Sequence, residues 1–181
     1  GFHDTERAQA AALFWQAFAA KLGKVMGPPD RALGFFEKTL NPRFALCARD
    51  ETGALLGLAG FQTKQGGLVH AGLTDVMRDY GPVGGLWRGL VLSVLERKIQ
   101  PGVFQMDGIF VEASARGQGV GTALLHAILA EAGERNMAQV QLDVIDINPR
   151  ARALYERVGF HPVSEESTGI FRHVFGFAKA T

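Results

Sequence analysis

The stretch VEASARGQGVGTALL, residues 111–125, contains three glycines at alternate positions, Gly117, Gly119 and Gly121. An apolar run that ends at Val111 precedes it, and apolar residues recur after it with the period of a helix. That helix face consists of Leu124, Leu125, Ile128, Leu129 and Ala132. The order is therefore strand, glycine loop, helix. Glycines let the backbone turn sharply and approach a ligand closely, and the first N–H groups of a helix lack internal partners, so this segment is suited to hold a phosphate.

Two familiar nucleotide-binding patterns do not fit the loop. A P-loop requires a lysine before its final Ser or Thr, but Gly121 is followed directly by Thr122. The dinucleotide fingerprint requires a third glycine at position 122 or 124, where the chain has Thr122 and Leu124. A phosphate loop of another kind and a glycine-rich turn without a ligand both remain open at this point.

Composition limits the class of protein. The chain has 181 residues, of which 47% are hydrophobic and 20% charged, so we expect a single globular domain over residues 1–181. The net charge of +1 argues against nucleic acid or a membrane surface as the main partner. No apolar run approaches the roughly 20 residues that span a bilayer, and we see no signal peptide. Gly1 in place of a methionine suggests an expression remnant or a missing N-terminus.

Cysteine and histidine usage narrows the chemistry. Cys47 is the single cysteine, so no internal disulfide forms, and we expect a cytoplasmic protein in which Cys47 is a small buried residue of a strand. The five histidines lack metal-ligand spacing, which predicts no metal site.

The first half of the chain reads as helices followed by a hairpin. Apolar periodicity predicts a helix over 4–22 and a second one from Asp30 to Leu40, and two apolar runs, 44–48 and 54–61, flank a turn that ends in glycine. Glycine pairs then bracket two further helical stretches, 72–80 and 86–98. The second stretch is expected to bury Leu86, Trp87, Leu90, Val91, Val94 and Leu95. These helices could cover the sheet, line a substrate pocket or form a homodimer contact.

The second half predicts a sheet. The run 103–111 is a strand, and Gly108 within it indicates a bulge or a close approach of another backbone. The run 139–145 alternates cleanly, and the helix between the two strands predicts a parallel pair with a right-handed crossover. Residues 160–163 and 170–177 read as two closing strands of a mixed sheet.

A second motif, NPRARALYERVGF, occupies residues 148–160. Asn148 and Pro149 suit the start of a helix, and Gly159 suits its end. Capping does not explain why Tyr155 stands where it does in the pattern N-x-x-A-x-x-L-Y-x-x-x-G-F.

Together, the R-x-x-G-x-G loop and this second pattern resemble the two signatures of the GCN5-related N-acetyltransferases, the GNAT family. The resemblance is close over about 103–163 and covers the rest in outline. It implies an α/β (α+β) fold, the GNAT N-acyltransferase fold, with a central twisted mixed sheet flanked by helices. Two features depart from the family pattern: the helical insertion at about 64–101, and the absence of an evident strand before the first helix.

The resemblance also implies the site. Acetyl-CoA would be the co-substrate, with its pantetheine arm along the backbone of Ile109, Phe110 and Val111, and with Asn148 contacting that arm or a water. Its pyrophosphate would lie on the loop formed by Arg116, Gly117, Gln118, Gly119, Val120, Gly121 and Thr122. Tyr155 would be the general acid that protonates the coenzyme sulfur, a nearly balanced transfer because thiol and phenol have reference pKa values of about 8.5 and 10. Asp107 or Glu112 would be the base that deprotonates a primary amine before direct attack in a ternary complex.

Two other functions are compatible with the same motifs. One is an acyl-CoA-binding sensor without turnover, which would need the loop but not Tyr155. The other is an acyltransferase that uses a longer acyl-CoA or a hydroxyl acceptor, with a pocket built from aromatic residues of the first half. The residues considered for that pocket are Phe14, Trp15, Phe18, Phe35 and Phe36.

Overall fold

The computed structural model of the chain describes residues 1–93, 99–144, 149–163, 166–167 and 179–180. Its helices are α1 (Arg7–Met26), α2 (Pro29–Thr39), α3 (Leu73–Tyr80), α4 (Pro82–Ser93), α5 (Val120–Glu134) and α6 (Pro149–Val158), with short 3-10 helices η1 (Asp4–Glu6), η2 (Pro42–Phe44) and η3 (Ala113–Ala115). Its strands are β1 (Ala45–Arg49), β2 (Leu55–Thr63), β3 (Gly66–Gly67), β4 (Val103–Val111), β5 (Gln139–Gln141), β6 (Glu166–Ser167) and β7 (Lys179–Ala180).

The main sheet is mixed, as predicted. Its strand order is β1-β2-β4-β5, and β3 also pairs with β2. The β1–β2 and β2–β4 pairs are antiparallel, whereas β4 and β5 are parallel and are connected through α5. The short strands β6 and β7 form a separate antiparallel pair.

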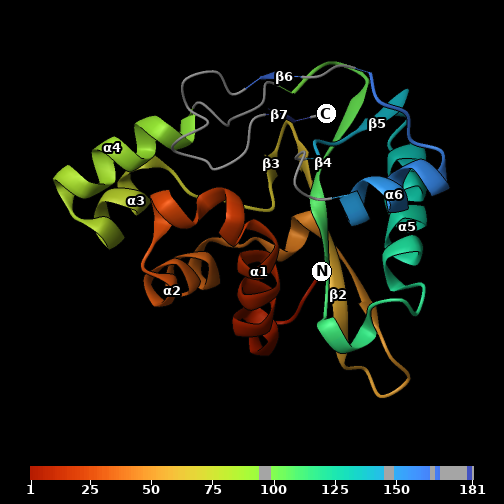
Figure 1. Ribbon diagram of the computed structural model, residues 1–181, viewed down its shortest axis with the longest axis horizontal. Helices are drawn as coiled ribbons and strands as arrows, with labels where there is room; N and C mark the ends of the chain where they lie inside the picture. The colour runs from red at the N-terminus through yellow and green to blue at the C-terminus, as the bar shows by residue number, and fades with distance from the viewer. Residues whose placement is uncertain (94–98, 145–148, 164–165, 168–178, 181) are drawn as a thin grey trace.

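Helices cover both faces of this sheet (Figure 1). α1 lies against one face, with α2 packed on α1, whereas α5 lies against the other face, with α6 beside it. Each face has its own apolar core. Phe110 of β4 belongs to the core under α1, whereas Ile109 and Val111 pack against the core under α5.

A bulge in β4 explains how side chains from both halves of this strand pack in the core under α5. Gly60 of β2 pairs with Gly108 and Phe61 pairs with Met106, so Asp107 is an extra residue in β4. Gly108 has φ +155, which glycine adopts readily. Side chains alternate between the faces of a strand, and one extra residue shifts that alternation. Met106 and Ile109 therefore both face α5, and the bulge predicted at Gly108 is confirmed.

The predicted insertion consists of β3, α3 and α4, and it is fixed to the end of α1 by two hydrogen bonds. The Tyr80 hydroxyl donates to the Met26 carbonyl at 2.5 Å, and Arg88 Nε donates to the Val25 carbonyl at 2.7 Å. The last carbonyls of a helix have no partner within the helix, so these side chains satisfy groups that would otherwise need water. The backbones of α3 and α4 approach closely at Gly85, where a Cβ would lie 2.3 Å from the Cα of Met77.

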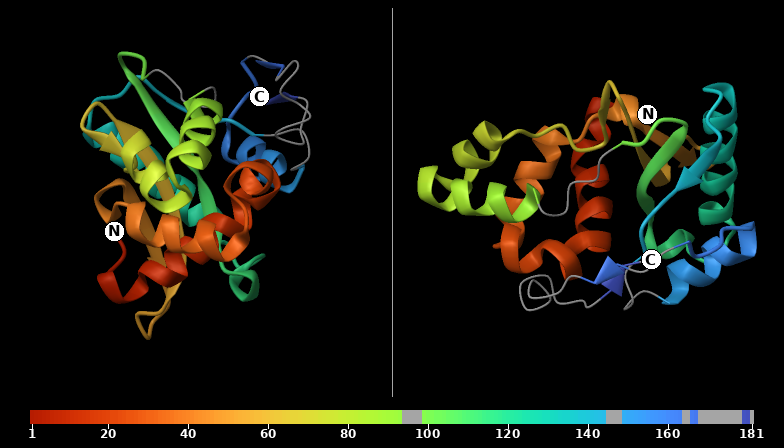
Figure 2. Two further views of the ribbon diagram at one scale, coloured as in Figure 1. Left: turned by 90° about the vertical axis from the view of Figure 1, so that its left-hand side faces the viewer. Right: turned by 90° about the horizontal axis from the view of Figure 1, so that it is seen from above.

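Two expectations for the insertion are wrong. Leu86, Trp87 and Leu90 were expected to be buried, yet their exposed fractions are 57%, 41% and 70%. The insertion does not cover the sheet either. Figure 2 shows α3 and α4 on the far side of α1 and α2 from the strands, where their inner faces meet helices and their outer faces meet solvent. Residues 94–98, in the second half of the predicted helix, lie outside the described residues.

The end of the chain also differs from expectation. β5 ends at Gln141, so the strand predicted over 139–145 is shorter in the structure, and residue 145 lies outside the described part. Residues 160–163 do not form a strand: Phe160 completes the end of α6 and Pro162 lacks an N–H to donate. The predicted strand over 170–177 lies outside the described residues. Among the helices of the described ranges, none is both long and apolar enough to cross a membrane.

Candidate functional site

The glycine loop is a left-handed turn that leads directly into α5. Gly117 has φ +78 and Gly119, the N-cap of α5, has φ +83. A Cβ placed on either residue would meet no other atom within 4 Å, so their outer side is open. The N–H groups of Val120, Gly121 and Thr122 have no carbonyl one turn earlier in the helix to bond. The turn therefore presents free space next to helix N–H groups, an arrangement that attracts anions.

Gly121 has a different role from the other two glycines. A Cβ there would lie 3.0 Å from Cδ2 of Leu154 on α6 and 4.0 Å from Cγ2 of Val111. The small residue lets α6 pack against the first turn of α5. Gly121 thus positions α6, and with it Tyr155, beside the loop.

Two polar side chains of the loop, those of Arg116 and Gln118, are bonded to the protein. Arg116 Nε donates to the Val111 carbonyl at 3.1 Å, and its Nη2 donates to Oε1 of Gln16 on α1 at 2.8 Å. Gln118 Nε2 donates to the Ser114 carbonyl at 2.8 Å. These bonds fix the shape of the loop and leave its backbone to meet a ligand. Gln16 was not identified from the sequence, because it lies 100 residues before Arg116.

One edge of β4 is open beside this loop. Within the described residues, β5 pairs only with Val103–Gln105 of β4, so the two strands separate toward the loop. The Glu112 N–H donates to Leu56 of β2. Because N–H directions alternate along a strand, those of Ile109 and Val111 point away from β2, toward the open edge. An extended ligand could pair with this edge as a further strand does.

The end of α6 gives the Tyr155 ring a structural role. The Phe160 N–H donates to the Tyr155 carbonyl at 3.0 Å, and the Gly159 N–H donates to the Glu156 carbonyl at 3.1 Å. With Gly159 at φ +103, this is a Schellman cap, in which the residues at its two ends touch. The rings of Tyr155 and Phe160 do so, with centroids 6.1 Å apart. The cap therefore accounts for the aromatic ring at position 155, but not for its hydroxyl.

Tyr155 is buried, with 8% of its surface exposed, and burial raises the pKa of its hydroxyl to about 12. It lines a cavity of about 300 Å³ between β5 and α6, together with Val140, Leu142 and Arg152. The phenol keeps its proton throughout the physiological range. It can donate a hydrogen bond or a proton there, and it cannot act as a base.

This raised pKa predicts an alkaline loss of stability that Tyr155→Phe removes. The phenol ionises near pH 10 when unfolded and near 12 when folded, so the unfolded state loses its proton first as the pH rises. The contribution is complete below pH 10 and decreases between 10 and 12, by about 1.4 kcal/mol at pH 11. Urea unfolding at pH 9 and 11 should show that wild type loses about this much more than the variant. Equal losses would contradict the raised pKa.

The two candidate bases have different surroundings. Asp107 is the extra residue of the β4 bulge, and its Oδ1 accepts a hydrogen bond from Gln62 Nε2 at 2.6 Å. Glu112 accepts from the N–H of Ala113 at 3.0 Å, as the cap of η3. Glu112 thus has a structural partner in its own loop, whereas Asp107 is joined to a residue that lines a cavity. Gln62 is a further candidate for the site that the sequence did not indicate.

A second cavity, with a volume of about 1060 Å³, lies between α1, α2, the insertion and β2. Phe14, Phe18, Phe35 and Phe36 line it, as considered from the sequence. Trp15 does not; it is buried against Phe36 instead, with centroids 6.0 Å apart.

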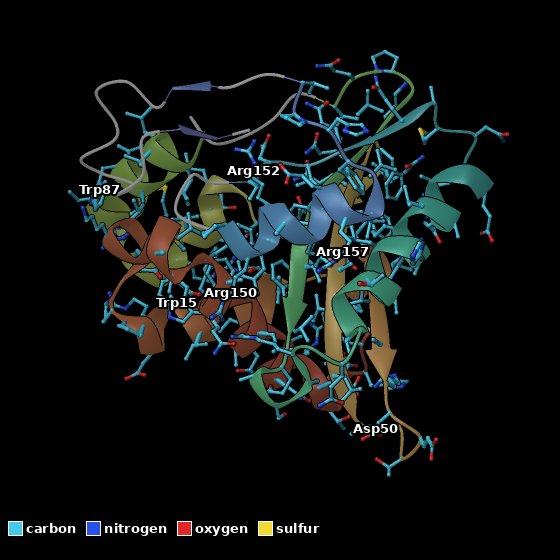
Figure 3. All side chains as sticks on the ribbon, turned by 45° about the vertical axis from the view of Figure 1, so that its right-hand side comes forward. Trp15, Asp50, Trp87, Arg150, Arg152 and Arg157 are labelled. Carbon is cyan, nitrogen blue, oxygen red and sulfur yellow. The ribbon has the colours of Figure 1, made fainter. Side chains whose placement is uncertain are left out.

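Positive charge lies on α6, next to the glycine loop. Figure 3 shows Arg150 and Arg152 in the first half of this helix and Arg157 near its end. All three are exposed, and Arg152 is paired with Glu156. Asn148, predicted to contact the coenzyme, lies outside the described residues. Within those residues, no three His, Cys, Asp or Glu side chains are grouped closely enough to hold a metal ion.

Comparison with known proteins agrees with these features. The sequence model of the acetyltransferase (GNAT) family matches residues 9–160. A thialysine N-epsilon-acetyltransferase from Bos taurus is 32% identical over 60 residues, a match that covers 33% of this chain and 35% of the relative, so it spans about a third of the relative's length.

Similar solved structures extend over nearly the whole chain. An N-acetyltransferase from Staphylococcus aureus Mu50 has a TM-score of 0.63 at 18% identity, covering 98% of this chain and 94% of that one. A ribosomal-protein-alanine N-acetyltransferase from Brucella melitensis has a TM-score of 0.62 at 15% identity, with 99% and 93% covered. An aminoglycoside N-acetyltransferase in complex with CoA has a TM-score of 0.55 at 16% identity, with 90% and 86% covered. At these identities the likeness establishes the fold, which is the one that the sequence motifs implied.

Proposed function

The chain belongs to the GNAT family of acetyltransferases, and we propose that it transfers the acetyl group of acetyl-CoA to a primary amine by direct attack in a ternary complex. The observation that carries this proposal is the open edge of β4 at Ile109–Val111, which continues into a glycine turn at the start of α5. An extended arm that ends in a pyrophosphate matches both parts at once.

Each part of the donor has a place in this proposal. The backbone of Ile109 would pair with the pantetheine arm, and the N–H of Val111, which points to the same open edge, would polarise the thioester carbonyl. The backbone from Arg116 to Thr122 would hold the pyrophosphate. Coenzyme A carries its negative charge at that end, and the exposed arginines of α6 would favour it there.

We infer the type of acceptor from the substrates for which similar proteins are named, and the base from the surroundings of Asp107. The similar proteins are named for acetylation of a lysine analogue, of a ribosomal-protein alanine and of an aminoglycoside, all of which carry amines. An alkyl ammonium has a pKa of about 10.4 and must lose a proton before it attacks. Asp107 is the base we favour, acting directly or through water, because Gln62 connects it to the large cavity. The Tyr155 hydroxyl would serve the departing thiolate as hydrogen-bond donor or general acid. We also propose a cytoplasmic location, which fits the single cysteine.

Cys47 provides a test of direct transfer. It lies half-buried on β1, and burial raises the pKa of its thiol, which disfavours the nucleophilic thiolate. Cys47→Ala should leave kcat unchanged within about twofold, since a conservative change outside the reacting groups removes no step. Loss of turnover by a folded variant would show that the acetyl group passes through the protein.

Release of free CoA thiol from acetyl-CoA, measured over a panel of primary amines, tests the proposed function. Amine-dependent release, with the acetylated amine identified by mass spectrometry, is the expected result. Tight CoA binding without release on any amine would favour the sensor. Release only with hydroxyl compounds or with longer acyl-CoA would favour the other acyltransferase.

A further inference from the structure

We propose that the acceptor is a primary amine carried on a bulky apolar body, bound in the cavity between α1, α2 and the insertion, and that polycationic amines are poor acceptors. This inference rests on the proposed function, because it names the substrate class of the same site. The cavity volume of about 1060 Å³ is slightly larger than the 300–1,000 Å³ that is usual for small-molecule pockets, so a bulky acceptor would fit.

The position of the cavity connects it to the donor edge. Phe14 and Phe18 of α1 line the cavity and also contact Phe110 of β4, with ring centroids 5.4 and 5.6 Å apart. Gln62 of β2 lines it as well, and donates to Asp107 in the β4 bulge. An amine held at the Gln62 end would therefore lie beside the strand along which the thioester is expected.

The lining selects for apolar groups. Besides the aromatic residues, its walls include Leu22, Met26, Val76, Leu86 and Leu92. Among the described residues that line it, none is Asp or Glu, and Lys64 carries a positive charge. A polycation that entered the cavity would lose the hydration of several charges, and no carboxylate in this lining would compensate for that loss. The apolar part of an amine does not have this desolvation cost.

The insertion supplies one side of the cavity. Leu73 and Val76 of α3, and Leu86 and Leu92 of α4, belong to the lining. Leu86 is also 57% exposed, so it lies where the cavity meets solvent. Val83, one turn earlier on α4, is 81% exposed and does not belong to the lining. Trp87, which Figure 3 shows at the outer side of the insertion, does not line the cavity either.

Leu86 and Val83 allow a matched test. Both lie in the first half of α4 and both are exposed, so a glutamate at either position should be tolerated by the fold. Leu86→Glu places a carboxylate at the cavity, whereas Val83→Glu adds the same charge outside it. The assay measures acetyl transfer from acetyl-CoA to two apolar amines, phenethylamine and hexylamine, and to two polycations, spermidine and kanamycin.

Wild type should use the apolar amines with at least about tenfold higher kcat/KM than the polycations, which is within the range of apolar pocket selectivity. Leu86→Glu should raise KM for phenethylamine about tenfold, with KM for acetyl-CoA unchanged. It should also reduce or reverse the ratio of kcat/KM between the apolar amines and the polycations. Val83→Glu should match wild type. Preference of wild type for spermidine or kanamycin, or equal behaviour of the two variants, would overturn the inference and leave the proposed function intact.

If no amine is acetylated, the proposed function fails, and binding alone then decides the inference. Calorimetry of phenethylamine with the CoA-loaded protein should show saturable binding that Leu86→Glu weakens and Val83→Glu does not. No saturable binding, or equal weakening by both variants, would overturn it.

Discussion

Tyr155→Phe should lower kcat for acetyl transfer by about 10²–10³-fold, the usual cost of removing one hydrogen-bond donor to a developing anion, with KM for acetyl-CoA nearly unchanged. The variant removes the hydroxyl alone. Phenylalanine keeps the ring that contacts Phe160 in the cap of α6, so the helix and its position beside the glycine loop are retained. Steady-state thiol release at saturating amine measures the effect.

Burial of Tyr155 refines the chemistry that the sequence predicted. With a pKa of about 12, the phenol is less acidic than the reference value of 10 on which a nearly balanced transfer depended. Relative to a thiol of reference pKa about 8.5, a complete transfer would be uphill by roughly 5 kcal/mol, unless the buried thiolate is also made more basic. The hydroxyl should therefore act mainly as a hydrogen-bond donor to the developing thiolate.

The pH profile separates this role from that of a base. Because the phenol remains protonated, kcat of wild type should not decline between pH 8 and 10 through ionisation of Tyr155. Tyr155→Ala is the control for packing, since it removes both ring and hydroxyl and should also destabilise α6. If Tyr155→Phe retains kcat within about twofold, its hydroxyl contributes less than any general acid would. The departing thiolate would then take its proton from water.

The parts of the site that follow local sequence rules were predictable. The glycine turn, the bulge at Gly108 and the C-terminal end of α6 depend on backbone preferences of one or a few residues, and the structure has all three. The parallel β4–β5 pair was predictable as well, since a strand, a helix and a second strand at this spacing leave few topologies.

What depends on distant contacts was not predictable. The apolar period of α4 indicates a buried face, but not which neighbour covers it, and α3 and α1 cover only part of it. The Gln16–Arg116 and Gln62–Asp107 bonds join residues 100 and 45 positions apart, and nothing local marks either glutamine. Gly159 correctly predicts the end of α6, but Phe160 is also predicted from the sequence to begin a strand over 160–163. The Schellman contact with Tyr155 decides between the two readings.

Gly119→Asp should weaken binding of CoA by about 100-fold or more, the second large effect we expect. Gly119 has φ +83, and no atom lies within 4 Å of the Cβ position, so the new side chain would enter the space assigned to the pyrophosphate. Asp tolerates this backbone region better than most residues. A carboxylate about 5 Å from one phosphate charge, at an effective dielectric of about 20, costs roughly 3 kcal/mol, which is more than 100-fold in Kd. Isothermal titration with CoA measures it.

Two further variants separate the possible causes. Gly53 in the β1–β2 turn has φ +86 and equally open surroundings, so Gly53→Asp carries the same backbone strain and charge away from the proposed site. It should lose a similar amount of stability and bind CoA normally. Gly119→Asn keeps the bulk without the charge, so its affinity should lie between those of wild type and Gly119→Asp. High salt should reduce the loss of CoA affinity in Gly119→Asp but not in Gly119→Asn, because only the aspartate repels the pyrophosphate by its charge, and the loop is exposed to solvent. Equal CoA affinity of Gly119→Asp and Gly53→Asp would exclude this turn as the pyrophosphate site. The proposal that the pantetheine arm pairs with the open edge of β4 would then lack a binding site for the anionic end of the coenzyme.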